Sequence, residues 1–316
     1  MKFTLLALLF VLLTCADLRA NNLNISAVTV TNGGATLDFT ISWDNSWRVL
    51  AQPANHDAVW LIVKRRDCAS IDYRHQDVSN TLGDHSFGVP LTATTTTDRK
   101  GLFIHRATSG QGNIVSVPVR IALHNPPAGE YDYKVVGIEM VYVPEGAFYV
   151  GDSSSNSGSN TLGIGPTSVG ANSPRPFYIG SEGPITISNV GAAGNLTSFL
   201  MTTSAGTDIL PAEYPKGFKA FYAMKYEISL GQFLDFLNSV NGAAGSPALH
   251  GYTTPQAGRN PVTGDYPFYT TTTPNRACDG ISWAGLLTYL DWAALAPMTE
   301  LEFEKLCRGL NVPVAN

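Results

Sequence analysis

Cysteines are the residues of this chain best suited to covalent or metal chemistry. Cys68, Cys278 and Cys307 would remain once an N-terminal export signal is removed. A thiolate nucleophile needs an activating neighbour, and the only histidine in the C-terminal part is His250. An odd number of cysteines in an exported chain leaves a free thiol, an intermolecular bridge or a missing partner. A structural role, as a Cys278–Cys307 disulfide, a bridge from Cys307 to another cysteine or buried thiols, is favoured over catalysis.

Histidines and carboxylates offer two further sites. A facial iron site could assemble across strands from histidines distant in sequence. No His-x3-His pair stands on a predicted helix, so loop or surface positions are the simpler interpretation of His56, His75, His85, His105 and His124. Glu300, Glu302 and Glu304 could form an acid-base pair, but helix capping explains them with fewer assumptions.

Three tryptophans could form a stacking platform for carbohydrate. Trp43, Trp47 and Trp60 lie in strand-like sequence, where such residues more often fill the core of a β-sandwich. The sequence therefore assigns no catalytic, cofactor-binding or metal-ligating residue.

The elements that would position these residues begin with a β-rich region, residues 21–134. Apolar Leu37, Phe39, Ile41 and Trp43 alternate with polar residues, which predicts a strand with one buried face. Val59–Val63 is apolar on both faces, as in a central strand. Several such strands without an amphipathic helix predict an immunoglobulin-like β-sandwich.

Helices are predicted only after Lys219. Ser229 with Gln232 and Thr299 with Glu302 have the spacing of capping boxes, in which the two side chains bond each other's backbone N–H groups. Ser282 is placed to cap a third helix, from about Trp283 to Ala294. These signals specify local structure and no chemistry.

The N-terminus predicts export. Lys2 precedes the uncharged run Phe3–Thr14, which is too short to span a bilayer, so residues 1–20 are interpreted as a signal peptide and no transmembrane segment is expected. The mature protein would be periplasmic, secreted or on the cell surface. Lipidation at Cys15 is the less favoured alternative. The net charge of −5 and the lack of a basic run argue against nucleic acid as a partner.

Three segments, in this order, resemble the formylglycine-generating-enzyme (sulfatase-modifying-factor) family. Gly137–Gly151 is similar to the opening strand and turn of that family, Met-Val-x-Val-Pro-Gly-Gly-x-Phe-x-Met-Gly. Its Phe-Tyr-Ile-x-x-x-Glu-Val-Thr segment is similar to Phe221–Ser229. Ile281–Ala284 is similar to its Val-Ser-Trp helix, and Met298–Glu304 to its Thr-Glu-x-Glu-Trp-Glu run. Arg308–Gly309 is similar to the Arg-Gly that follows this run. Ala296 replaces the family's arginine before that run, and Glu145 stands where glycine is usual.

The resemblance implies an α+β chain in which the sandwich of residues 21–134 precedes a partial domain of C-type-lectin-like fold. That domain would cover residues 135–316, be incomplete at its C-terminus and carry a Ser/Gly-rich insertion at about 152–210. Cys307 falls where members carry a disulfide cysteine whose partner lies downstream.

The resemblance also gives the functional expectation. The complete protein would oxidise a cysteine of a protein or peptide substrate to formylglycine, with copper and calcium bound beyond Gly309. Residues 1–316 alone would hold no cofactor and would be inactive. The alternative is a non-catalytic module that binds a protein, peptide or glycan, or assembles at the cell surface.

Overall fold

The structure is a computed structural model that describes residues 22–151, 163–164, 176–188, 196–197, 207–240 and 261–311. The predicted signal peptide, Cys15, His250 and most of the Ser/Gly-rich insertion lie outside these residues.

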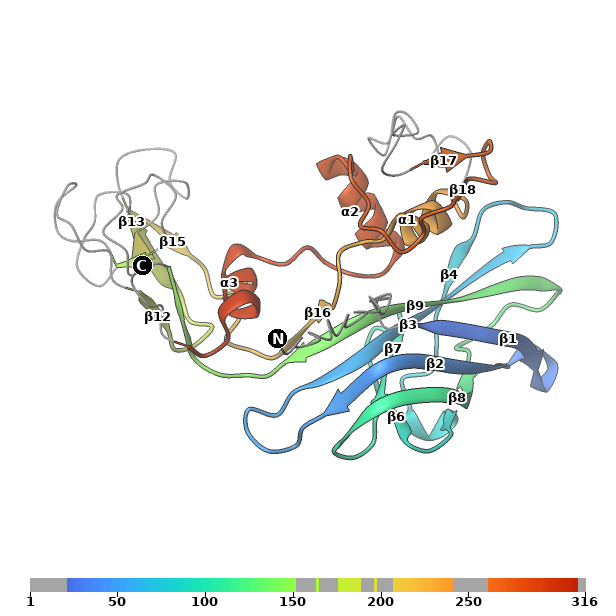
Figure 1. The fold of residues 1–316 in the computed structure, drawn as a ribbon, viewed down its shortest axis with the longest axis horizontal. Helices are drawn as coiled ribbons and strands as arrows, with labels where there is room; N and C mark the ends of the chain where they lie inside the picture. Colours follow the sequence, from blue (N-terminus) through green and yellow to red (C-terminus); the bar gives the residue numbers. More distant parts are fainter. Residues whose placement is uncertain are drawn as a thin grey trace, which may run out of the picture.

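Two groups of antiparallel strands form the N-terminal part (Figure 1). One group pairs in the order β1 (Asn24–Thr31), β2 (Thr36–Arg48), β8 (Gly110–Ala122) and β5 (Ser86–Phe87). The other contains β9 (Tyr131–Val143), β3 (His56–Asp67), β7 (Leu102–Arg106) and β6 (Leu91–Thr95), with β4 (Arg74–Gln76) also paired to β3. The groups join where Arg48 of β2 pairs with His56 of β3, and two short 3₁₀ turns, Asn32–Gly34 and Leu82–Asp84, lie in the connections.

These two groups pack against each other as a sandwich of strands, with the first hydrophobic core between them. Leu37, Phe39, Ile41 and Trp43 of β2 are all buried in it, as their alternation predicts. Val59, Leu61 and Val63 of β3 face them from the second group.

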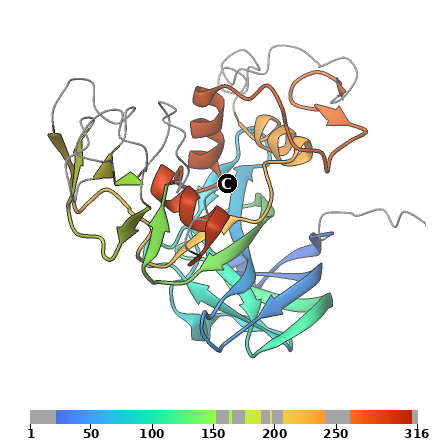
Figure 2. The same ribbon diagram turned by 60° about the vertical axis from the view of Figure 1, so that its left-hand side comes forward.

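Strand β3 is buried on its other face as well. Trp60 and Ile62 belong to a second core, together with Ile138 and Met140 of β9. This core is closed by α1 (Leu230–Leu237) and α2 (Trp283–Trp292), which cover the β3–β9 face as a helical layer (Figures 1 and 2). The double burial that the sequence shows at Val59–Val63 therefore reflects two cores rather than one sandwich.

Both predicted capping boxes are formed. The Ser229 side chain accepts from Gln232 N, and the Gln232 side chain accepts from Ser229 N, which fixes the start of α1. Thr299 and Glu302 do the same for α3 (Glu300–Arg308). Ser282 caps α2 by accepting from Gly285 N. A short hairpin, β17 (Val262–Thr263) with β18 (Thr270–Thr271), lies between α1 and α2 in sequence.

Strand β9 belongs to both predicted domains. It pairs with β3 from Tyr131 to Tyr142, and with β16 (Phe221–Met224) from Met140 to Val143. The predicted boundary between residues 134 and 135 therefore falls inside one continuous strand.

A third core packs α3 against β10 (Phe148–Val150). Leu301 of α3 is buried there with Phe148 and Val150. The strands around it are β12 (Phe177–Ile179), β11 (Gly163–Ile164), β13 (Ile185–Ser188), β14 (Leu196–Thr197) and β15 (Thr207–Leu210). The whole is a sheet-rich α+β fold, as predicted at that level. None of the helices in the described ranges combines the length and apolarity needed to cross a membrane.

The C-terminus of α2 is bound to β3 by two side chains of that strand. Trp60 Nε1 donates to Ala293 O at 2.9 Å, and Lys64 Nζ donates to Trp292 O and lies 5.0 Å from the centre of the Trp292 ring. The last carbonyls of a helix have no partner within it. These two donors therefore satisfy groups that would otherwise be buried unpaired.

Titration of Lys64 gives a testable consequence. Burial lowers the pKa of Lys64 from 10.5 to about 8. Below pH 8 this lysine is protonated in both the folded and the unfolded chain. From pH 8 to 10.5 a larger fraction of the unfolded chain is protonated. The lysine therefore makes the fold more stable as pH rises through this interval. The comparison is with Lys64→Met, which cannot titrate at this position. The difference in free energy of unfolding, wild type minus variant, should rise by about 2 kcal/mol between pH 8 and pH 10.

Urea unfolding measures this difference, and Lys134→Met, which removes a lysine of the surface ion pair with Asp235, is the matched control. A difference that stays flat or falls over this interval for Lys64→Met would contradict the assignment.

Candidate functional site

The three described cysteines are free thiols. Cys68 and Cys307 are exposed, and Cys278 is half-buried beside the start of α1, where its N–H donates to Ile228 O at 2.8 Å. Of the structural alternatives left open by the sequence, a Cys278–Cys307 disulfide is therefore not formed. Burial raises the pKa of the Cys278 thiol to about 12, which keeps it protonated at neutral pH and so a poor nucleophile and metal ligand.

The prediction of loop or surface histidines is wrong for His56 and His105, which are buried in strands β3 and β7. His85 lies in a loop, as predicted, but is buried there. The His56 ring stacks on Tyr142 with centroids 4.7 Å apart, meets His105 edge-on at 4.8 Å and bonds Tyr222 Oη through Nε2 at 3.1 Å. Burial lowers the pKa of His56 to about 3, so the imidazole is neutral. These rings pack together where β3, β9 and β16 meet.

The remaining candidates have structural positions. Trp43 and Trp60 are buried in the first and second cores. Glu302 completes a capping box and Glu304 pairs with Arg308 at 3.2 Å. Among the residues that the structure describes, no group of three or more His, Cys, Asp or Glu side chains could hold a metal ion.

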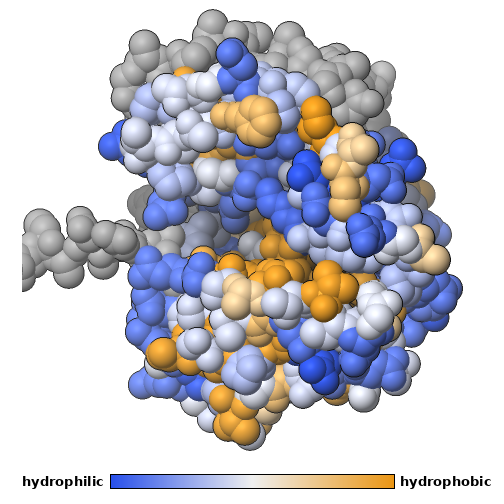
Figure 3. All heavy atoms as spheres, turned by 90° about the vertical axis from the view of Figure 1, so that its right-hand side faces the viewer, coloured by the Kyte–Doolittle hydropathy of each residue, from blue (hydrophilic) through white to orange (hydrophobic). Residues whose placement is uncertain are grey.

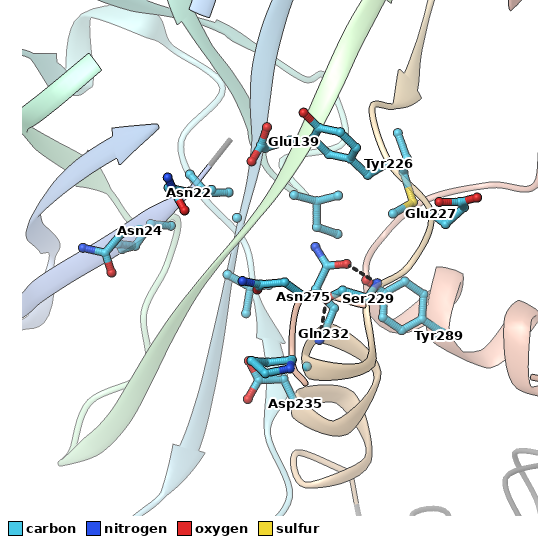
Figure 4. A pocket seen from close by; sticks show the side chains of 18 of the residues that line it. Asn22, Asn24, Glu139, Tyr226, Glu227, Ser229, Gln232, Asp235, Asn275 and Tyr289 are labelled. Atoms are coloured by element: carbon cyan, nitrogen blue, oxygen red, sulfur yellow. Dashed lines mark hydrogen bonds between the residues drawn. The ribbon is translucent and has the colours of Figure 1, made fainter. Parts of the chain in front are cut away.

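A groove of about 640 Å³ lies between the sandwich and the helical layer. Figure 3 shows this face hollowed, with hydrophobic residues on the floor of the hollow. Strand β9 runs along the groove from Lys134 to Glu139, residues 22–25 line one side, and the N-terminal half of α1 with residues 274–277 lines the other (Figure 4).

The helical wall of the groove is held in place by hydrogen bonds. Gln232 is bound to Ser229 in the capping box (Figure 4), and Asp235 pairs with Lys134 at 2.9 Å across the groove. Asn275 is exposed on the same wall. On the opposite wall Asn22 donates to Asp44 at 2.6 Å. Amide and carboxylate groups from segments far apart in sequence therefore line one groove.

A charged cluster closes one end of the groove at Glu139. Lys225 Nζ lies 3.9 Å from Glu139 Oε2 and 3.9 Å from Asp57 Oδ2, and it stacks over the Trp47 ring at 4.7 Å. Asp57 also accepts from Trp43 Nε1 at 2.8 Å. Burial raises the pKa of Asp57, and these donors counter that effect. The cluster connects the groove to the sandwich core.

Sequence reasoning did not find this groove, because its residues come from separate segments without a shared motif. One signal was present: Gly137 stands inside a strand, where glycine often marks a close approach. A Cβ at Gly137 would lie 2.9 Å from Ile25 Cδ1 and 3.1 Å from Leu23 Cδ2, so β1 could not pack against β9 as it does with a larger residue there.

Comparison with known proteins gives no match: no family model, no curated protein and no solved structure matches the chain.

The thiols differ in a way that labelling can measure. At pH 8, Cys278 should react with iodoacetamide more slowly than the exposed Cys68 and Cys307, because it is half-buried and protonated. Mass spectrometry of tryptic peptides over a time course gives the three rates. Fastest labelling at Cys278 would reveal an activated thiol and overturn its structural role.

Proposed function

We propose that the chain is an exported recognition protein whose ligand site is the groove between β9 and α1. In this proposal an immunoglobulin-like sandwich and a scaffold related to formylglycine-generating enzyme share strand β9 and hold the two walls of the site. The observation that carries the proposal is the groove itself, hollowed between two separate hydrophobic cores.

The size and lining of the groove support binding. Ligand pockets usually have volumes of about 300–1,000 Å³ and combine apolar surface with a few fixed polar groups. Here Val135 and Val136 supply apolar surface, and Gln232 and Asp235 are held by bonds inside the protein. A site whose polar groups are already ordered loses less conformational entropy when it binds.

Export fits this role. The predicted signal peptide would place the groove outside the cytoplasm, where proteins, peptides and glycans are the available partners.

The second candidate is the oxidase that the resemblance names. It is favoured by the packing of the three resembling segments: Met140, Met224 and Ile281 all contact the second core. Incubation of the full-length protein, with the region beyond Gly309 that the resemblance implies, with copper and a cysteine-containing sulfatase peptide tests it. An aldehyde product detected by mass spectrometry would support the oxidase, and unchanged peptide would leave recognition as the better proposal.

Filling the groove should abolish binding. Asn275→Trp places a large ring on the exposed helical wall, and Asn80→Trp is the control because Asn80 is exposed in the loop after β4, which does not line the groove. Both variants should keep the wild-type circular dichroism spectrum and melting temperature.

A random ten-residue peptide library and a panel of soluble oligosaccharides are the probes. Ligands retained by the wild type and by Asn80→Trp should be lost, at least tenfold, by Asn275→Trp. Equal retention by all three proteins, or no ligand in either panel, would contradict the groove as the binding site.

A further inference from the structure

We infer that the groove takes an extended peptide, which adds as a strand to the outer edge of β9. This rests on the proposed function and names the class of ligand for the same site. The inference comes from how β9 is paired along its two sides.

One side of β9 is paired along almost its whole length, and the other is not. The β3 side is paired from Tyr131 to Tyr142. On the outer side β16 pairs only from Met140 to Val143, and Lys225 N extends this by donating to Glu139 O at 2.9 Å. In the described part of the chain, no strand pairs the outer edge from Lys134 to Ile138.

The direction of the free backbone groups follows from this pairing. Successive residues of an antiparallel strand direct their N–H and C=O groups to opposite sides. Because Glu139 O points to the β16 side, the groups of Val135 and Gly137 point the same way, into the groove. The groups of Lys134, Val136 and Ile138 bond β3 instead. The groove therefore presents an array of donors and acceptors spaced by two residues.

The space beside this unpaired edge of β9 lies in line with β16. After Lys225 the chain turns away into the capped start of α1 at Ser229, and leaves the edge open over five residues of β9. At ~3.4 Å per residue this stretch is about 17 Å long. An unpaired strand edge of this kind is a template for a further strand.

The walls of the groove limit what can enter. The start of β1 lies on one side of the edge, and α1 with residues 274–277 on the other. An intact sheet of a second protein copy would meet both walls, whereas a single extended segment fits between them. Side chains of such a segment would point alternately toward Asn22 and Asn24 and toward Gln232 and Asn275. An oligosaccharide has no backbone amides at this spacing, which favours a peptide.

Amide hydrogen exchange in the free protein tests the geometry. The amides of Val135 and Gly137 should exchange at least tenfold faster than those of Val136 and Ile138, since only the latter are bonded to β3. Residue-resolved NMR measures these rates. Uniform protection along residues 134–138 would show that the edge is already occupied and would overturn the inference.

The second test uses the tightest peptide from the ten-residue library. Its binding should protect Val135 and Gly137 against exchange. Single N-methylation along the peptide should weaken binding about tenfold at alternate positions only, as expected for loss of one backbone hydrogen bond at each.

The outcomes separate the two proposals. A ligand that is lost in Asn275→Trp but leaves Val135 and Gly137 unprotected, or shows no alternation on N-methylation, would overturn strand addition and leave the groove as the site. Binding that Asn275→Trp does not weaken would overturn the proposed function itself.

Discussion

The bonds from β3 to the end of α2 are the interaction on which the groove depends. Trp60 and Lys64 lie on the face of β3 that points away from the sandwich core, and both donate to carbonyls where α2 ends. Buried carbonyls without a partner are costly, so these bonds favour the register that brings Ala293 to Trp60. Because α1 packs in the same core as α2, its N-terminal half is held at a fixed distance from β9.

Buried lysines perform the same task elsewhere in the chain. Lys305 Nζ donates to Pro144 O at 2.8 Å and to Gly217 O at 2.6 Å, and thereby attaches α3 to two irregular segments. Lys216 Nζ donates to Tyr214 O at 2.8 Å. An ammonium group has three donors and no acceptor, so one lysine can satisfy several carbonyls of loops that lack ladder partners. Burial lowers the pKa of Lys305, because the charged ammonium group is removed from water.

Local patterns predicted local structure well, and long-range pairing is where the sequence fell short. The alternation in β2 and the Ser229 and Thr299 capping boxes each depend on a few neighbouring residues, and the structure has all three. The sequence did not predict that β9 is shared by both parts, because β9 pairs with β3 and β16, which lie about 80 positions before and after it. The groove lies beside that strand, so its walls could not be assembled from sequence either. The histidines were misplaced for the same reason: β-sheet neighbours bury His56 and His105.

The central claim is that the sandwich and the helical layer form one cooperative unit around β3, which gives the groove a fixed shape. Native-state hydrogen exchange in increasing guanidinium chloride tests this directly, by comparing amides in the middle of α1 and α2 with those of β3. We expect the opening free energies of all three elements to converge on one global value. A helical layer whose amides open at a distinctly lower free energy, while β3 stays protected, would contradict it.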